Sequence, residues 1–206
     1  MKARLAAVVP AAGFSRRMGR EKILLPFGRS TVLETIFETL EAAGVTQRVA
    51  VLRPDLAEAA DLARRAGARV IVNPRPEEPM LLSIRLGLDS LAGQADAVFI
   101  WPADHPAVSL AAIELLAASA DPARALLPTH RGRRGHPALV GKDLLPEIAS
   151  IRPEEGLRRL WRIRTDAVLE VPVEDPGVLR NIDTPSDYEK AIAEEKKRKG
   201  AQEKGS

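Results

Sequence analysis

Short apolar runs alternate along the chain with longer segments whose apolar residues recur every three or four positions. The short runs are typical of buried strands, and the periodic segments are typical of amphipathic helices. The predicted strands are Leu5–Val9, Val49–Leu52, Arg69–Val72, Ala97–Trp101, Ala125–Pro128 and Val168–Val173. The predicted helices are Thr31–Ala43, Pro54–Ala66, Leu82–Leu91, Ser109–Ala118 and a last one that begins at Thr184.

The alternation of strands and helices predicts an α/β fold, a single doubly wound domain with a mostly parallel sheet. Ala97–Trp101 is apolar throughout, which predicts a central strand. The segment from His130 to Arg164 is less regular, and we expect it to form a substrate-covering insertion on the same sheet. We place the domain at residues 1–190 and a charged helix end or tail at residues 191–206.

Two of the predicted helices begin with a capping signal. Thr31 and Glu34 have the spacing of a capping box, in which each side chain accepts a hydrogen bond from the other residue's backbone N–H. Thr184 and Asp187 repeat this spacing, and Pro185 stands at the first helical position. These residues therefore predict where both helices start.

Composition and charge narrow the range of functions. The net charge of the 206 residues is +3, and the tail from Glu194 to Lys204 accounts for much of it. With only 3% aromatic residues, a nucleic-acid-binding surface is not indicated. Cysteine is absent, and no apolar run reaches the roughly 18 residues of a membrane-spanning helix. No signal peptide is evident, so we expect a cytoplasmic protein that does not bind membranes.

The segment Pro10–Lys22, which follows the first strand, carries the strongest indication of function. Small residues, two glycines, arginines and a lysine suit a loop whose backbone N–H groups approach phosphates while cations neutralise them. It has neither the Gly-Lys-Ser/Thr of a Walker A loop nor the G-x-G-x-x-G of a dinucleotide fingerprint. The alternative is an ordinary strand–helix loop with surface cations.

Two aspartates stand where a metal ion would be useful. Asp104 follows the predicted central strand, and ligands gather beyond the carboxyl ends of parallel strands. Asp183 directly precedes the last helix. The alternative roles are a helix cap for Asp104 and favourable helix-start electrostatics for Asp183.

The loop after the first strand resembles the signature A-A-G-x-S-x-R-M-G-x-x-K of the MobA-like nucleotidyltransferases. This family includes enzymes that attach CMP or GMP to molybdopterin. The matching residues are Ala11, Ala12, Gly13, Ser15, Arg17, Met18, Gly19 and Lys22, and Leu24–Gly28 matches the continuation L-L-P-x-G. The resemblance implies a Rossmann-like fold of the nucleotide-diphospho-sugar transferase type, with Arg17 and Lys22 as the catalytic residues that bind the triphosphate.

The resemblance also implies the rest of the nucleotide and metal site. Asp104 matches the aspartate of the family's G/A-D-x-P sequence and Asp183 that of I-D-T-P-E-D-L, the ligands of Mg²⁺. Asn73 and Ser83 match a segment that lines the nucleotide site, although Pro79 stands where many members carry glycine. The implied nucleotide contacts are thus Ala11, Ala12, Gly13, Phe14, Ser15, Arg17, Lys22, Asn73, Ser83 and Asp104.

The acceptor side is less specific. Gly135-His136-Pro137 matches a G-H-P element near the acceptor, and we expect His105, Arg134 and His136 to contact the substrate. His105 replaces a methionine common in some members, and a plain loop role is an alternative for it. Glu155-Gly156-Leu157-Arg158 departs from the G-D-x-G-A-R of the molybdopterin cytidylyltransferases, which leaves the acceptor open.

The implied reaction transfers NMP from a nucleoside triphosphate to a phosphate-bearing small molecule of the molybdopterin type and releases pyrophosphate. Ala12 favours CTP, because a side chain at this position narrows the base pocket. The alternatives are a sugar- or polyol-phosphate nucleotidyltransferase and a non-catalytic module that binds a nucleotide and delivers a cofactor. A molybdoenzyme or a cofactor-biosynthesis protein is the protein partner that the resemblance suggests.

Overall fold

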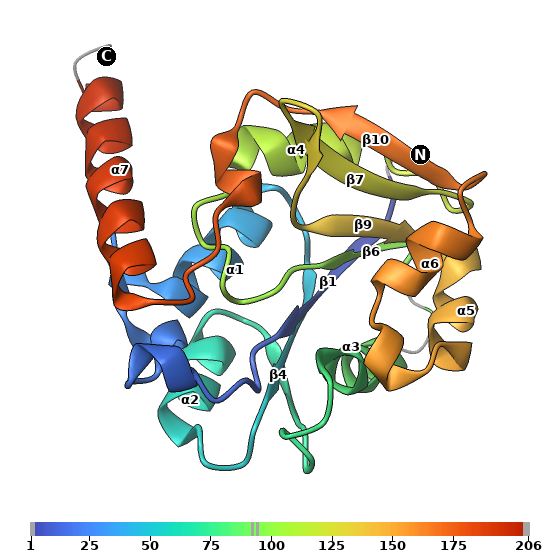
Figure 1. The fold of residues 1–206 in the computed structure, drawn as a ribbon, viewed down its shortest axis with the longest axis horizontal. Coiled ribbons are helices and arrows are strands. Elements are labelled where there is room, and N and C mark those ends of the chain that lie inside the picture. Colours follow the sequence, from blue (N-terminus) through green and yellow to red (C-terminus); the bar gives the residue numbers. More distant parts are fainter. Residues whose placement is uncertain (1–2, 92, 94, 204–206) are drawn as a thin grey trace.

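The computed structural model describes residues 3–91, 93 and 95–203, and eight strands of this part form one sheet (Figure 1). Seven of them follow the order β10-β7-β9-β6-β1-β4-β5, and β8 pairs with β7. A separate two-stranded ribbon consists of β2 (Pro26–Phe27) and β3 (Ser30–Thr31). The strands of the main sheet are β1 (Leu5–Pro10), β4 (Gln47–Leu52), β5 (Arg69–Val72), β6 (Ala97–Ile100), β7 (Ala125–His130), β8 (Arg133–Arg134), β9 (Ala138–Gly141) and β10 (Val168–Pro172).

Helices cover both faces of this sheet. The side chains of β1 alternate between the faces: Ala7 belongs to one core cluster, and Ala6 and Val8 belong to another. One face packs against α1 (Val32–Ala42), α2 (Ala57–Arg65) and α4 (Leu110–Ala118). The other face packs against α3 (Met80–Ser90), α5 (Leu145–Ser150) and α6 (Arg158–Ile163). The predicted doubly wound α/β fold is therefore confirmed.

Gly87 brings α3 close to the sheet. A Cβ atom at Gly87 would lie 2.4 Å from Cγ1 of Val8 and 3.1 Å from Cγ2 of Val51. Only a residue without a side chain therefore fits at this contact. The close approach places the N-terminal end of α3 near the carboxyl ends of the strands, where the candidate site lies.

Most predicted elements agree with the structure to within two residues at each end. The α2 helix is an exception at its start, because it begins at Ala57 and not at Pro54. Val32–Ala42 is capped by the predicted box of Thr31 and Glu34. In the segment 130–164, β9 joins the sheet between β6 and β7 and is antiparallel to both, an arrangement that the sequence did not predict.

The chain ends in α7 (Pro185–Glu203), which starts at the predicted capping pair of Thr184 and Asp187. Its first turns pack against the loop region, where the Tyr188 hydroxyl donates to the carbonyl of Pro26 at 2.6 Å and Ala191 is buried. Residues 204–206 of the predicted tail lie outside the described part. Among the described helices, none combines the length and the apolar composition needed to cross a membrane.

Candidate active site

The loop after β1 has an unusual backbone conformation. Ser15 has a φ of 49° and Gly19 a φ of 65°, on either side of a short 3-10 turn, Arg16–Met18. The Ser15 hydroxyl donates to Glu21 at 2.8 Å and accepts from the backbone N–H of Lys22 at 3.3 Å. A Cβ atom on Gly13 would meet no described atom within 4 Å, so the space beside this glycine is open to a ligand.

Arg53, directly after β4, hydrogen-bonds to two residues of the loop after β1. Its guanidinium donates to the carbonyl of Gly13 at 2.8 Å and to the Glu21 carboxylate at 2.5 Å. Arg53 is among the most buried of the paired arginines, with 10% of its side chain exposed. Sequence reasoning missed this role, because Arg53 lies 40 residues from Gly13 along the chain.

Lys22 lies where three segments meet. Its ammonium group is 3.3 Å from Oδ2 of Asp104 and 3.4 Å from Oδ1 of Asp183, and it donates to the carbonyl of Ile182 at 3.2 Å. Arg17 pairs with the other oxygen of Asp183 at 3.1 Å. The structure thus brings together the two cations and the two carboxylates that the sequence analysis singled out. Arg17 and Lys22 come from the loop after β1, Asp104 from the end of β6, and Asp183 from the start of α7.

The carboxylate of Asp104 is oriented by His105, whose Nδ1 donates to Oδ1 at 2.7 Å. Burial alone would raise the pKa of Asp104, but the hydrogen bond from His105 and the charges of His105 and Lys22 hold it well below its usual range. Ser109 caps α4. Asp104 is therefore ionised near neutral pH, and it is not the cap of that helix.

His105 and His136 pack against each other, with ring centroids 4.6 Å apart. Burial lowers the pKa of His136 to about 4, in the same direction as the charges of His105 and Arg158 and against that of Asp104. His136 is therefore neutral near pH 7. Its Nδ1 is buried and has no hydrogen-bond partner within the described residues, so a ligand is free to supply one.

The other predicted nucleotide contacts lie in two places, in the loop and between β5 and α3. Ala11 and Ala12 are buried, whereas Phe14 is 41% exposed. The guanidinium groups of Arg16 and Arg53 each lie 5.2 Å from the centre of its ring. Asn73 and Ser83 are buried and joined by a hydrogen bond of 3.0 Å. That bond ties the end of β5 to α3, and neither residue contacts the Lys22 cluster through a hydrogen bond or ion pair.

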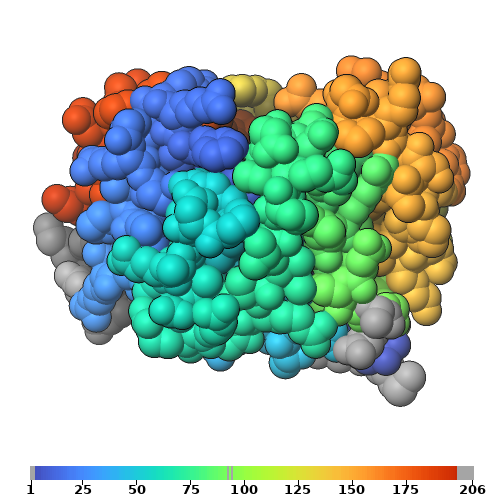
Figure 2. Space-filling model, turned by 90° about the horizontal axis from the view of Figure 1, so that it is seen from below, coloured from blue at the N-terminus to red at the C-terminus, as the bar shows by residue number. Residues whose placement is uncertain are grey.

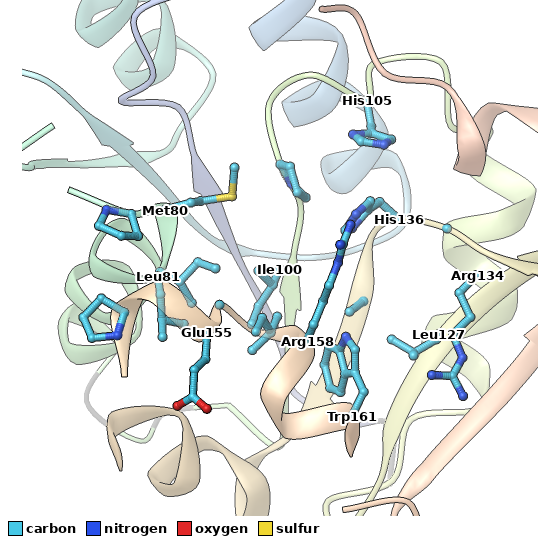
Figure 3. A pocket seen from close by; sticks show the side chains of 18 of the residues that line it. Met80, Leu81, Ile100, His105, Leu127, Arg134, His136, Glu155, Arg158 and Trp161 are labelled. Atoms are coloured by element: carbon cyan, nitrogen blue, oxygen red, sulfur yellow. The ribbon is translucent and has the colours of Figure 1, made fainter. Parts of the chain in front are cut away.

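A cavity of about 570 Å³ adjoins Asp104 (Figure 3). His105, Arg134 and His136, the predicted acceptor contacts, are among the residues that line it. Arg134 pairs with Glu170 at 2.8 Å. Figure 2 shows that the N-terminal segment (blue), the α3 region (green) and the helices after β9 (orange) lie side by side on one face of the molecule.

The residues present suit a divalent metal that also binds phosphate. The described residues contain no cluster of three or more His, Cys, Asp or Glu side chains that could hold a metal ion. Asp104 and Asp183 nevertheless face one point, which the Lys22 ammonium shares. Mg²⁺ is typically bound through one or two carboxylates together with waters and substrate phosphates, so two aspartates fit this ion.

The doubly wound sheet, with cations and carboxylates at the carboxyl ends of its strands, defines the chain as an α/β nucleotidyltransferase. The chain belongs to the MobA-like NTP transferase family, whose domain model matches residues 7–168. The predicted family and enzyme class are thereby confirmed. Which residues bind nucleotide, metal and acceptor stays a prediction.

Curated relatives carry several names. The chain is 28% identical over 185 residues to the molybdenum cofactor cytidylyltransferase of Escherichia coli K12, covering 88% of this chain and 92% of the relative. It is 32% identical to the molybdenum cofactor guanylyltransferase of Rhodobacter capsulatus, covering 96% and 99%. It is also 27% identical to the nicotine blue oxidoreductase of Paenarthrobacter nicotinovorans, covering 86% and 91%. Relatives at this level of identity thus do not share one substrate.

Solved structures agree with the fold. A nucleotidyl transferase from Methanothermobacter thermautotroptrophicus superposes with a TM-score of 0.82 at 27% identity, covering 94% of this chain and 98% of the other. Rv0371c from Mycobacterium tuberculosis, solved as a complex with manganese, superposes with a TM-score of 0.74 at 25% identity, covering 92% and 98%.

Proposed function

We propose that this nucleotidyltransferase transfers CMP from CTP to the phosphate of a molybdopterin-type acceptor and requires Mg²⁺. The observation that carries the proposal is the meeting of Lys22, Asp104 and Asp183 from three separate segments. The manganese complex of a structural relative and the molybdenum cofactor enzymes among the curated relatives support it.

In the proposed reaction an oxygen of the acceptor phosphate attacks the α-phosphorus of the nucleotide. A new P–O bond forms, the bond from the α-phosphorus to the bridging oxygen breaks, and pyrophosphate leaves. The attacking phosphate is already an anion, so no general base is needed. Lys22 and Arg17 neutralise charge on the phosphates, and the loop amides near Gly13 orient them. Mg²⁺ held by Asp104 and Asp183 would supply further positive charge at the reacting phosphates.

Ala12 supports the preference for CTP. This residue is buried at the second small position of the loop. In our proposal, its methyl group narrows the space for the base of the nucleotide. Overall sequence identity does not decide between CTP and GTP, because the relatives include both a cytidylyltransferase and a guanylyltransferase. We expect Ala12→Gly to increase the use of GTP relative to CTP.

Pyrophosphate release tests the proposal. Purified protein is incubated with CTP or GTP, with Mg²⁺ or EDTA, and with molybdopterin or a sugar phosphate as acceptor. We expect release with CTP, Mg²⁺ and molybdopterin, and a loss on the order of 100-fold or more in turnover for Lys22→Ala, assayed well below the melting temperature of the variant. Lys190→Ala on the exposed side of α7 is the matched control.

Other outcomes would contradict the proposal in distinct ways. Release with a sugar phosphate alone would indicate a sugar-phosphate nucleotidyltransferase. Tight nucleotide binding without release from any acceptor would indicate a module that delivers a cofactor. Full activity of Lys22→Ala would show that the lysine has no role in the reaction.

A further inference from the structure

The Lys22 ammonium group lies among three oxygens from two distant segments of the chain. They are Oδ2 of Asp104 at 3.3 Å, Oδ1 of Asp183 at 3.4 Å and the carbonyl oxygen of Ile182 at 3.2 Å. Only 16% of the Lys22 side chain is exposed, so salt screens these contacts weakly. Carboxylate and carbonyl oxygens are also the ligands of hard divalent cations. The ammonium group therefore occupies the point at which the two carboxylates would hold a metal ion.

The two carboxylates are held in place without this ammonium group. The other oxygen of Asp104 is hydrogen-bonded to Nδ1 of His105 at 2.7 Å, and that of Asp183 accepts from Nδ2 of Asn181 at 2.6 Å. The backbone N–H of Ile182 donates to the backbone carbonyl of Asp104 at 2.8 Å, which joins the two segments directly. Both carboxylates would therefore still face the same point after the ammonium group has left it.

The Lys22 side chain can move while its backbone stays in place. The backbone N–H donates to the Ser15 hydroxyl at 3.3 Å, and Lys22 begins the 3-10 turn Lys22–Leu24. The ammonium group stands at the end of a flexible four-carbon stem, so it can turn toward an anion beside the loop. Gly13 leaves open space in this loop, because a Cβ atom there would meet no described atom within 4 Å.

The charges of the cluster compensate one another. Lys22 and Arg17 contribute two positive charges, and Asp104 and Asp183 contribute two negative charges. A free divalent ion gains little at such a cluster, because it must give up bound water and is repelled by both cations. The phosphates of a nucleotide would attract the two cations and leave two uncompensated carboxylates.

We propose that Lys22 is a built-in counter-ion, which gives up the two aspartates to a divalent metal only when a nucleoside triphosphate binds. This inference rests on the metal site of the proposed function, and it adds how the two ligands depend on each other. Metal and nucleotide then bind cooperatively, and the coupling is reciprocal, because each ligand tightens the binding of the other. Lys22 thereby keeps free metal ions out of the site until the substrate arrives.

Metal binding without nucleotide tests this inference. The probe is Mn²⁺, and electron paramagnetic resonance measures the free ion in titrations of the full chain. We expect Lys22→Met to lower the Kd for Mn²⁺ at least about tenfold relative to the wild type, because no ammonium group competes for the oxygens. Loss of a residue that merely supported the site would weaken metal binding. Lys22→Arg keeps a cation and should stay within about threefold of the wild type.

Two further variants separate competition from a general change in charge. Arg20→Met removes one positive charge from the same loop, but Arg20 is exposed and its guanidinium lies 5.8 Å from the ring centre of Tyr188. We expect its Kd for Mn²⁺ to stay within about threefold of the wild type, because an exposed charge is screened. Adding Asp183→Asn to Lys22→Met should abolish the gain in affinity, because it removes one of the two carboxylates.

The dependence of CTP binding on metal measures the coupling. Titration calorimetry gives the Kd for CTP with Mn²⁺ and with EDTA. We expect Mn²⁺ to tighten CTP binding in the wild type, and this gain to be about tenfold smaller in Lys22→Met, where the metal displaces no cation. If Lys22→Met is less stable than the wild type, its melting temperature still reports metal binding, since Mn²⁺ alone should raise it more than in the wild type.

Two results would overturn the inference. One is a Kd for Mn²⁺ in folded Lys22→Met that equals or exceeds that of the wild type. The other is a gain in affinity that persists after Asp183→Asn is added, since the ion would then lie elsewhere. Pyrophosphate release by the wild type, measured separately, tests the proposed function. Release without the gain in Mn²⁺ affinity would contradict only this inference, and the gain without release would contradict only the transfer reaction.

Discussion

At the scale of single residues, the geometry of the glycine loop depends on Arg53. One guanidinium holds both the Gly13 carbonyl and the Glu21 carboxylate, and Glu21 in turn accepts from Ser15. Arg53→Lys keeps the charge but replaces a planar fork by a single ammonium group, which does not reproduce both contacts. We expect the KM for CTP to rise about tenfold with a smaller change in kcat, because the loop would lose its preformed shape.

Steady-state kinetics with varied CTP at saturating acceptor measures this effect. Arg64→Gln is the control, because Arg64 is exposed on α2 and pairs with Asp61 at the surface. An unchanged KM in Arg53→Lys would show that the loop keeps its conformation without the bridge from β4.

The same scale shows how far a sequence predicts a site. Lys22, Asp104 and Asp183 were singled out because each follows a strand or precedes a helix in a recognisable motif, and the structure brings them together. Arg53 was missed, because its importance lies in contacts across the chain that no local pattern records. His105 was expected at the substrate or as a plain loop residue, and its bond to Asp104 depends on a side-chain geometry that spacing does not give.

At the scale of elements, the sequence predicted the strands and helices that recur with a clear period. It did not predict β9, because four apolar residues between turns fit a strand, a buried helix turn or a loop equally well. The position of β9 between β6 and β7 is set by pairing with strands more than ten residues away. Local propensity carries no information about such a partner.

The contact of α3 with β1 gives a prediction at this scale. Gly87→Ala improves helix propensity by about 1 kcal/mol but forces a methyl group against Val8, which is fully buried and cannot move aside. We expect the free energy of unfolding to fall by about 1–3 kcal/mol, measured by urea denaturation. Adding Val8→Ala should cost less in the Gly87→Ala background than in the wild type, because it relieves the clash. A neutral or stabilising Gly87→Ala would show that the contact is loose.

At the scale of the whole molecule, the two sides of the site come from different parts of the chain. The first fifty or so residues supply the glycine loop and its support from β4, and the segment after β6 supplies Asp104, the histidines and the cavity. The α7 helix closes the arrangement, because the segment before it carries Asp183 to Lys22 and its first turns pack on the loop region. The fold therefore couples the candidate nucleotide and acceptor sides through one cluster of charges.

The burial of His136 makes the stability of the whole molecule depend on pH. Its pKa is about 4 in the folded protein and 6.5 as an ordinary histidine, so the unfolded chain binds the proton first as the pH falls. Protonation therefore favours unfolding between these two values, and the free energy of unfolding should fall by about 2 kcal/mol from pH 7 to pH 5 through this residue alone. Asp104, whose pKa is also lowered, titrates below that window. Urea denaturation at both pH values should show a smaller loss for His136→Gln, which cannot take up a proton at this position. An equal loss in variant and wild type would mean that other groups set the pH dependence and that the imidazole accepts its proton without cost in the folded protein.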